Sequence, residues 1–375
     1  MFSKLSKHSF LTDYWQQQPY LFVDALPQAV DLIDGDELAG LACEDSVESR
    51  IVAGYDPQGE WVCHQGPFPD FDYDALGLRN WTLLVQGVDQ WDDALRALLE
   101  HFSFLPRWRL EDIMASFAPQ GGGVGPHFDY YDVFLIQCRG RRKWRLGQQC
   151  DDRTSIQVHD TIKLLAHFEQ SACVDMAPGD MLYVPGGLAH WGTSLSDDCV
   201  TLSVGFRAPS NDELFSEAIH ILSDQLVAEH RFRDTRQSLD DDPFKLNDYA
   251  LDYAVRAWRD LPPEHWHAAL HEALGRLVTD SRYVGSSETQ TSCDVSHIQR
   301  RLAQTGSLVL RPAPHARLAY SRTQLFANGV AFNASESFSR QLCHGKLFAP
   351  LSAEECRILV VLLNEQLIEL TGQAS

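Results

Sequence analysis

The sequence predicts an α+β protein with a β-rich N-terminal part, then a helical segment and then a mixed C-terminal segment. The N-terminal part contains short runs of aromatic and β-branched residues bounded by Gly and Pro turns, a pattern typical of strands. After residue 207 the apolar residues recur at a spacing of about 3.6 instead of two. A length of 375 residues favours two to three domains, which we place at 1–207, 208–285 and 286–375.

In the N-terminal part, a strand is predicted over His127–Gln137 because this run is rich in aromatic and β-branched residues. His127 and Asp129 are two positions apart, so a strand would point both side chains to the same face. Phe128 would then face the other way. This pair is the first half of a candidate site.

A glycine run, Gly121–Gly125, precedes this strand. A phosphate-binding loop is not expected here, because such a loop needs a helix N-terminus after it and usually a Lys-Ser/Thr pair. Pro126 and an aromatic strand follow instead. The glycines are therefore expected to permit close approach of the backbone and a mobile lip beside the site.

Two Gly- and Pro-rich turns organise the next part of the chain. Pro178–Asp180 forms the first and Pro185–Gly187 the second, with a short apolar strand predicted over Met181–Val184 between them. His190 enters the strand that follows, sixty-one positions after Asp129.

His127, Asp129 and His190 together match a metal site of two imidazoles and one carboxylate. Such a set occupies one face of an octahedral Fe(II) and leaves three positions open, whereas a structural zinc site is closed. Because oxygen chemistry needs open positions, the three residues predict an oxygenase. A His-x-Asp pair alone is a weak signal, and the turn at 178–180 with the distal histidine is what favours a metal over ordinary strand histidines.

Longer motifs around these residues resemble those of the JmjC-type 2-oxoglutarate-dependent ribosomal oxygenases. The motifs are GGGVGPHFD at 121–129, YDVF at 131–134, GRRKWR at 140–145 and PGDMLYVP at 178–185. The runs FLTDYW and PYLF within residues 10–22 are similar to the helix-then-strand entry of that family, and WTLLVQ at 81–86 to a later core element. The resemblance covers about the first 207 residues by motif and the remainder by domain order.

The resemblance implies a double-stranded β-helix (cupin/JmjC) fold that holds Fe(II) and 2-oxoglutarate, with dioxygen as the second cosubstrate. Arg142 matches the family's basic residue for the distal carboxylate of 2-oxoglutarate, which a guanidinium can hold through two parallel hydrogen bonds. Ser116 and Thr201 match its hydrogen-bonding positions. From the residues alone, most charges in the run 139–145 are surface charges, because only about half of a strand faces inward, and each hydroxyl is an ordinary strand residue.

The activity that the resemblance implies is 3-hydroxylation of an arginine side chain in a large-subunit ribosomal protein. No catalytic side chain beyond the metal ligands is required, because the cofactors carry the chemistry and the protein orients the target carbon. Histidine hydroxylation or N-methyl demethylation of a protein stays open within the enzyme class. Outside it, a non-catalytic cupin that binds protein or nucleic acid stays open, although retention of the ligands and Arg142 argues against it.

Helical patterns dominate residues 208–285. Ser210 or Asn211 is expected to cap a helix whose apolar face contains Leu214, Phe215, Ala218, Ile219, Leu222 and Leu226. Two further helices are predicted over Asp248–Leu261 and Pro263–Val278. Their wide apolar faces suit packing on each other or on a second copy of the chain, and the resemblance favours a homodimer formed through this bundle.

The C-terminal segment is predicted to contain helix, strand, hairpin and helix, an order that resembles a winged-helix module. Val295–Gln304 is helical, Ser307–Leu310 is extended, and a hairpin over Ala316–Phe332 turns at Asn328-Gly329. A capping box at Ser352–Glu355 begins a helix expected to continue through Leu370. The absence of an arginine-rich recognition helix makes nucleic acid an unexpected partner.

The charge of the chain, −21, is unevenly distributed. Residues 1–205 carry 14 Lys and Arg against 30 Asp and Glu, residues 206–290 carry 9 against 16, and residues 291–375 carry 8 against 6. An acidic surface around the site repels nucleic acid and attracts a cationic protein, which favours a basic ribosomal protein as the substrate. Solubility alone is an equal explanation of that surface.

Cysteine usage and hydropathy indicate the compartment. The nine cysteines are scattered without a Cys-x-x-Cys pair, so neither a disulfide framework nor a zinc ribbon is expected. Residues 1–20 contain no apolar signal core, and no apolar stretch approaches eighteen residues. We therefore expect a cytoplasmic protein with no membrane partner.

Overall fold

The computed structural model describes residues 5–54, 61–157, 161–225, 231–233, 245–246, 248–281, 283 and 293–371. The chain forms two compact units, residues 1–208 and 209–375. The boundary between these units falls one residue after the first predicted domain boundary. The second predicted boundary, at residue 285, lies outside the described residues.

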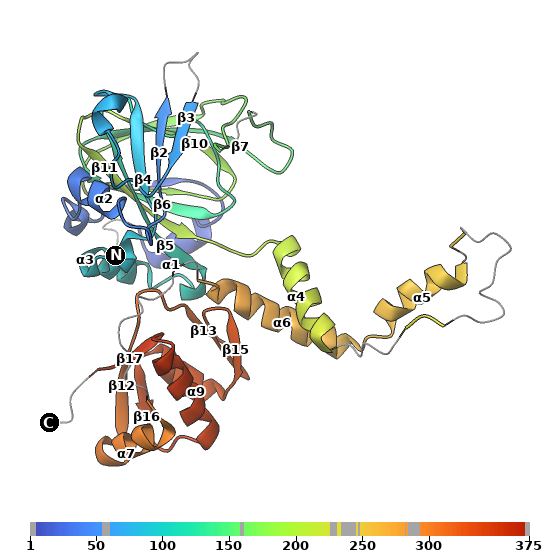
Figure 1. Cartoon of the computed structure of the whole chain (residues 1–375). Coiled ribbons are helices and arrows are strands. Elements are labelled where there is room, and N and C mark those ends of the chain that lie inside the picture. Colours follow the sequence, from blue (N-terminus) through green and yellow to red (C-terminus); the bar gives the residue numbers. More distant parts are fainter. Residues whose placement is uncertain are drawn as a thin grey trace. The chain divides into compact units, whose positions relative to one another are not determined.

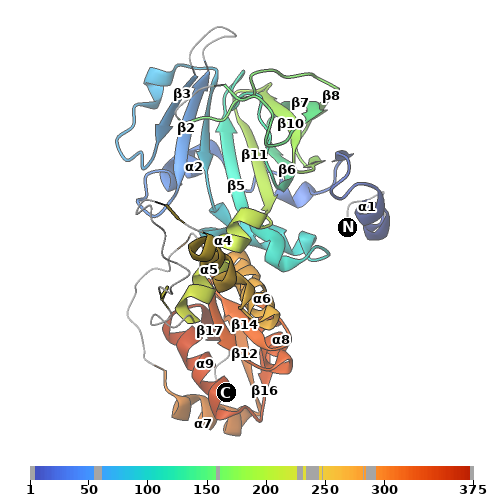
Figure 2. The ribbon, with the colours of Figure 1, turned by 90° about the vertical axis from the view of Figure 1, so that its right-hand side faces the viewer.

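Unit 1 (residues 1–208) contains two antiparallel sheets and short helices, as Figures 1 and 2 show, which confirms the α+β prediction. The larger sheet has the order β1 (Tyr20–Phe22), β9 (Met181–Val184), β6 (Asp132–Arg139), β11 (Cys199–Phe206), β5 (Leu110–Ala118), β4 (Trp81–Val85), β2 (Ser49–Gly54) and β3 (Trp61–Gln65). The smaller sheet has the order β10 (Leu188–Ser194), β7 (Arg142–Gln149) and β8 (Ala172–Met176). The helices are α1 (Lys7–Asp13), α2 (Gly35–Leu41) and α3 (Asp93–Leu98).

The larger sheet separates an apolar core from a polar pocket. Side chains alternate along each strand, so in β4 the residues Leu83 and Val85 enter the core, whereas Thr82 and Leu84 line the pocket. The same alternation in β5, β6 and β11 places large aromatic rings such as Phe134 in the core. One face of the sheet therefore stabilises the fold and the other is available for chemistry.

A buried polar network fixes the start of β6. One carboxylate oxygen of Asp132 accepts a hydrogen bond from Tyr183 Oη at 2.6 Å, and the other forms an ion pair with Arg109 Nη2 at 2.9 Å. The Arg109 guanidinium also stacks over the Trp15 ring, 5.5 Å from its centroid. These contacts anchor the chain three residues after Asp129.

The strand predicted over His127–Gln137 is shorter than expected, since β6 begins only at Asp132. His127 joins the sheet region through a single isolated bridge to His190. The carbonyl of Asp129 accepts a hydrogen bond from Gly187 N at 2.7 Å, so this stretch follows the turn before β10 rather than a strand ladder. His127 and Asp129 nevertheless direct their side chains into the same pocket.

Unit 2 (residues 209–375) begins with three helices, α4 (Asn211–Gln225), α5 (Asp248–Arg259) and α6 (Pro263–Thr279). Ser210 caps α4 as predicted, because its hydroxyl accepts a hydrogen bond from Glu213 N while the Glu213 carboxylate accepts one from Ser210 N. Helices α4 and α6 pack together through small and apolar residues such as Ala218 and Ala273. Leu226, predicted on the same face, lies outside the described residues.

The rest of unit 2 combines two small sheets with helices. The elements are α7 (Val295–Thr305), β12 (Ser307–Pro312), β13 (Leu318–Tyr320), β14 (Gln324–Ala327), β15 (Val330–Asn333), α8 (Glu336–Cys343), β16 (Lys346–Phe348), α9 (Ala353–Asn364) and β17 (Ile368–Thr371). The hairpin turn at Asn328-Gly329 is confirmed, and both residues have positive φ, as a type I′ turn requires.

The predicted end of the last helix is wrong. Helix α9 starts at the capping box of Ser352 but ends at Asn364 instead of continuing through Leu370. Gln366 adopts a positive φ of 58°, and Ile368–Thr371 then pairs with β12 as strand β17. Tertiary pairing with β12 thus overrides the helical periodicity of this segment.

Among the described residues, no helix combines the length and the apolar composition that crossing a membrane would require.

Candidate metal centre

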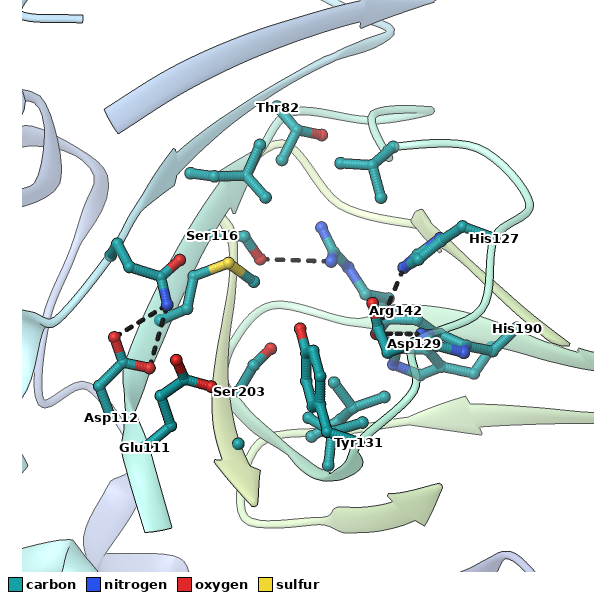
Figure 3. Close-up of a pocket in the computed structure, with 18 residues that line it drawn as sticks. Thr82, Glu111, Asp112, Ser116, His127, Asp129, Tyr131, Arg142, His190 and Ser203 are labelled. Carbon is teal, nitrogen blue, oxygen red and sulfur yellow. Dashed lines mark hydrogen bonds and ion pairs between the residues drawn. The ribbon is translucent and has the colours of Figure 1, made fainter. Parts of the chain in front are cut away.

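The three predicted metal ligands converge in one pocket of unit 1, as Figure 3 shows. One nitrogen of each histidine and one oxygen of Asp129 all lie within 4.8 Å of one another. His127 Nε2 and His190 Nε2 are 4.0 and 3.7 Å from the same Asp129 oxygen, Oδ2. Three donor atoms at these separations can bind one ion between them, so the donor set fits a 2-His-1-carboxylate site for Fe(II).

Backbone carbonyls set the orientation of both imidazole rings. His127 Nδ1 lies 3.0 Å from the carbonyl oxygen of Gly125, and His190 Nδ1 lies 3.0 Å from that of Leu188. Because a carbonyl only accepts, each Nδ1 carries the proton and leaves the Nε2 lone pair directed at the shared point. Burial, followed by the proximity of His127, lowers the pKa of His190 to about 4. The ring is therefore neutral at neutral pH, as a metal ligand must be.

The backbone holds the ligands close together. His127 N donates to the carbonyl of His190 at 3.1 Å, and His190 N donates to that of His127 at 2.8 Å. A Cβ at Gly123 would clash with the backbone of Gly192 in β10. The close approach expected of the glycine run is confirmed at this position.

Arg142 lies in the same pocket and is 4% exposed. Its Nη1 donates to Ser116 Oγ at 3.3 Å, and its guanidinium carbon lies 5.6 Å from the centroid of the Trp144 ring. Its Nε and Nη2 are buried and have no hydrogen-bond partner among the described residues. A buried cation with unused donors is costly unless an anion completes it, so this position fits the carboxylate of a ligand.

The other charges of the run 139–145 lie nearer the surface, as strand alternation predicts. Arg139 contacts Asp198 at 3.5 Å, and Lys143 contacts Asp175 at 3.7 Å. Their side chains are 39% and 34% exposed. Arg142 is therefore the member of this run that the fold directs inward.

The two predicted hydroxyls differ in their positions. Ser116 lines the pocket and accepts the hydrogen bond from Arg142, whereas Thr201 is not among the lining residues. Thr201 Oγ1 donates to Gln137 Oε1 at 3.1 Å. Thr201 lies opposite Ser116 in the sheet, but its hydroxyl proton is engaged elsewhere.

The pocket also contains acidic and aromatic residues that the sequence did not single out. Glu111, Asp112, Tyr131 and Ser203 line what we call its acidic end, and Arg142, Ser116 and Thr82 line its cationic end (Figure 3). Gln86 Nε2 donates to both oxygens of Asp112 at 3.0 and 2.9 Å, so this carboxylate, 3% exposed, is held in one orientation.

A second buried carboxylate, Asp89, lies close enough to Asp112 for the two charges to interact. Asp89 is 4% exposed and accepts a hydrogen bond from Ile113 N at 2.8 Å. Burial is the main cause that raises its pKa to about 6, and nearby Asp112 adds to the rise. The signal available in the sequence was a pair of adjacent carboxylates, Glu111 and Asp112, inside an otherwise apolar strand.

Comparison with known proteins identifies the family to which these motifs correspond. A family model described as a JmjC domain matches residues 97–214. The chain is 44% identical over 207 residues to the ribosomal protein uL16 3-hydroxylase of Escherichia coli, a match that spans 55% of this chain and 54% of that protein. It is 31% identical over 337 residues to a probable ribosomal oxygenase of Haemophilus influenzae, spanning 85% of this chain and 80% of that protein.

Solved structures match over nearly the whole chain. The X-ray structure of Escherichia coli YcfD is 30% identical, with a TM-score of 0.81 over 98% of this chain and 99% of that chain. A structure of YcfD described as a ribosomal oxygenase in complex with cobalt and 2-oxoglutarate is 31% identical, with a TM-score of 0.78 over the same shares. The fold is thus shared over nearly the whole chain.

Proposed function

The chain belongs to the JmjC ribosomal oxygenases, and from that premise we propose that it is an Fe(II)- and 2-oxoglutarate-dependent dioxygenase that hydroxylates an arginine side chain of a basic large-subunit ribosomal protein, uL16 being the candidate. The premise rests on the relative that is 31% identical over most of both chains. The observation that carries the proposal is the single pocket in which the three ligands, a buried arginine and a buried aspartate meet.

With iron bound, 2-oxoglutarate and dioxygen would be converted to succinate and carbon dioxide. The second oxygen atom of dioxygen would be inserted into a carbon–hydrogen bond of the substrate. His127, Asp129 and His190 would hold the iron. Arg142 binds the distal carboxylate of 2-oxoglutarate with its unused donors.

The acidic end of the pocket suits a cationic target side chain. Asp112 is already oriented by Gln86, so a guanidinium meets a fixed carboxylate rather than a mobile one. Tyr131 lies on the same side, where burial, followed by the charge of Asp129, raises the pKa of its hydroxyl. It therefore stays a neutral donor at neutral pH. These groups place a target carbon near the metal and leave no acid–base step for the protein.

Purified ribosomal proteins provide the test of this function. The protein would be incubated with Fe(II), 2-oxoglutarate and air, and both succinate and the intact mass of each ribosomal protein would be measured. We expect one protein to gain the mass of one oxygen atom, with the change mapped to an arginine by tandem mass spectrometry. Loss of methyl groups, or a gain mapped to histidine, would contradict the proposed reaction.

We also propose finer features of the fold. The two facing sheets of unit 1 are assigned to the double-stranded β-helix of cupins, supported by the strand orders given above. Residues 286–375 are assigned to a winged-helix-like domain, supported by helix α7, the following strands and the type I′ hairpin. Residues 208–285 are assigned to a separate helical domain.

Homodimerisation is proposed through the helical domain. Helix α5 exposes Leu251, Val255 and Trp258 by 52 to 54%, at the spacing of one helix face. A second copy of the chain would cover this face. Val255→Asp should convert a dimer into a monomer in light scattering, whereas Asp248→Asn should not; a dimer that persists in Val255→Asp would refute this interface.

The charge of the chain supports a proposal for its partners. The near-neutral C-terminal segment makes nucleic acid an unexpected partner, and the acidic catalytic part suits a basic protein. We propose a cytoplasmic location, where ribosomal proteins are made.

A further inference from the structure

The cationic end of the pocket contains a buried hydroxyl to which the sequence analysis assigned no role. Thr82, in β4, is 1% exposed and lines the pocket. Its Oγ1 has no hydrogen-bond partner among the described residues, a property that it shares with Nε and Nη2 of Arg142. Buried polar atoms are nearly always hydrogen-bonded, so unpaired groups gathered in one pocket indicate a polar ligand there.

The sheet register brings Thr82 to Ser116 and Arg142. Leu84 in β4 pairs directly with Ser116 in β5, so Thr82, two residues earlier on the same face, lies diagonal to Ser116. Ser116 Oγ in turn accepts the hydrogen bond from Arg142 Nη1. In Figure 3, Thr82 and Ser116 both lie beyond the Arg142 guanidinium, away from the three metal ligands.

The hydroxyl of Thr201 is less suited to donate a hydrogen bond to a ligand in the pocket. This hydroxyl donates to Gln137 Oε1 at 3.1 Å. The Ser116 hydroxyl in turn donates to the carbonyl oxygen of Thr201 at 3.3 Å. The Gln137 side chain also donates to the carbonyl of Arg139 at 2.7 Å, which holds it in place at the irregular pairing of β6 with β11. The Thr201 proton is thus already used inside the sheet.

We propose that Thr82, and not Thr201, donates a hydroxyl hydrogen bond to the distal carboxylate of 2-oxoglutarate. This inference rests on the proposed function and assigns a residue to its cosubstrate. A carboxylate has about four acceptor sites, and a guanidinium fork uses two of them. The Ser116 hydroxyl already gives its proton to the carbonyl of Thr201, so the unpaired hydroxyl of Thr82 is the one that can serve a remaining site. Thr82 would then help to select a dicarboxylic keto acid.

Binding of 2-oxoglutarate to the Mn(II)-loaded protein tests the assignment without turnover. Dissociation constants would be measured by isothermal titration calorimetry for the wild type, Thr82→Val, Thr82→Ser and the matched control Thr201→Val. We expect Thr82→Val to weaken binding roughly tenfold, as loss of a hydrogen bond to a charged group does. Thr82→Ser keeps the hydroxyl and should stay within about twofold, as should Thr201→Val.

The results distinguish a wrong assignment of Thr82 from a wrong proposed function. Unchanged binding in Thr82→Val, or a tenfold loss in Thr201→Val with no loss in Thr82→Val, would overturn the assignment and restore Thr201. A wild type that binds Mn(II) but not 2-oxoglutarate would instead overturn the proposed function, and the Thr82 assignment with it. Mn(II) affinity reports whether each variant is folded. If Thr82→Val does not fold, Thr82→Ala should show the same loss of 2-oxoglutarate binding.

Discussion

The two ends of the pocket differ in charge and also in how completely the protein satisfies their polar groups. At the cationic end, Arg142 keeps two buried donors without a partner. At the acidic end, both oxygens of Asp112 accept hydrogen bonds from Gln86. The cationic end is therefore incomplete without an anionic ligand, whereas the acidic end is oriented before any substrate arrives. This difference suits a cosubstrate that binds first and a protein side chain that docks into a prepared site.

The largest effect is expected from the three metal ligands. His127→Ala, Asp129→Ala and His190→Ala should each abolish succinate formation, because no remaining group can replace a ligand of an open iron site. Circular dichroism should show that the fold is mostly retained, since the site is catalytic and not structural. Persistent turnover in Asp129→Ala would refute the site.

A large effect confined to the cationic end is expected from Arg142→Ala. It removes the charge that faces the cosubstrate carboxylate, so the concentration of 2-oxoglutarate needed for half-maximal turnover should rise strongly, by the equivalent of about 2 to 5 kcal/mol. Arg139→Ala, which removes a half-exposed charge, is the matched control and should change little. A strong rise in the 2-oxoglutarate requirement of Arg139→Ala or Lys143→Ala would show that a basic residue other than Arg142 points at the cosubstrate.

The acidic end should respond in the complementary way. Asp112→Asn removes the negative charge but keeps the shape, so the KM for the protein substrate should rise by the equivalent of about 1.5 to 3 kcal/mol. The affinity for 2-oxoglutarate should stay the same, because that ligand binds at the other end. An equal change in both constants would show that the two ends are not separate.

A smaller effect concerns the cost of burying charge at the acidic end. The pKa of Asp89 is raised to about 6 in the folded protein, so its contribution to stability is lost as the pH rises from about 4 to about 6. Asp89→Asn should remove a cost of roughly 3 kcal/mol at pH 7 and lose about 1 kcal/mol for the hydrogen bond from Gln90.

Chemical unfolding at two pH values checks this expectation. The variant should be more stable than the wild type by about 2 kcal/mol at pH 7, and the gain should vanish near pH 4. A gain that is independent of pH would indicate a packing effect instead of the titration of Asp89.

The smallest expected effect is that of salt on substrate docking. Residues 1–205 carry a net charge of −16, so association with a basic ribosomal protein should weaken as salt rises to physiological levels, where the Debye length is about 8 Å. Binding of 2-oxoglutarate in the enclosed pocket should change less over the same range. Salt-insensitive docking, measured by fluorescence anisotropy, would assign recognition to contacts other than the acidic surface.

The three ligand candidates and Arg142, which the structure brings into one pocket, could be picked out from the sequence because their signals are local. Two turns and a distal histidine indicate the ligands, the family resemblance selects Arg142, and strand alternation is compatible with one inward arginine among exposed charges. The acidic end and Thr82 were missed because β4 and β5 meet only through long-range antiparallel pairing, which no local spacing encodes. For the same reason the end of helix α9 was misjudged, since strand β17 forms by pairing with β12.

The central claim is that the acidic end recognises the positive charge of a protein arginine next to the iron. The most direct measurement compares two uL16 peptides, one with the target arginine and one with citrulline, its neutral isostere, at saturating 2-oxoglutarate. The account predicts that only the arginine peptide gains the mass of one oxygen atom, in step with succinate. Equal hydroxylation of the citrulline peptide, or succinate formed with no mass gain on the arginine peptide, would contradict it.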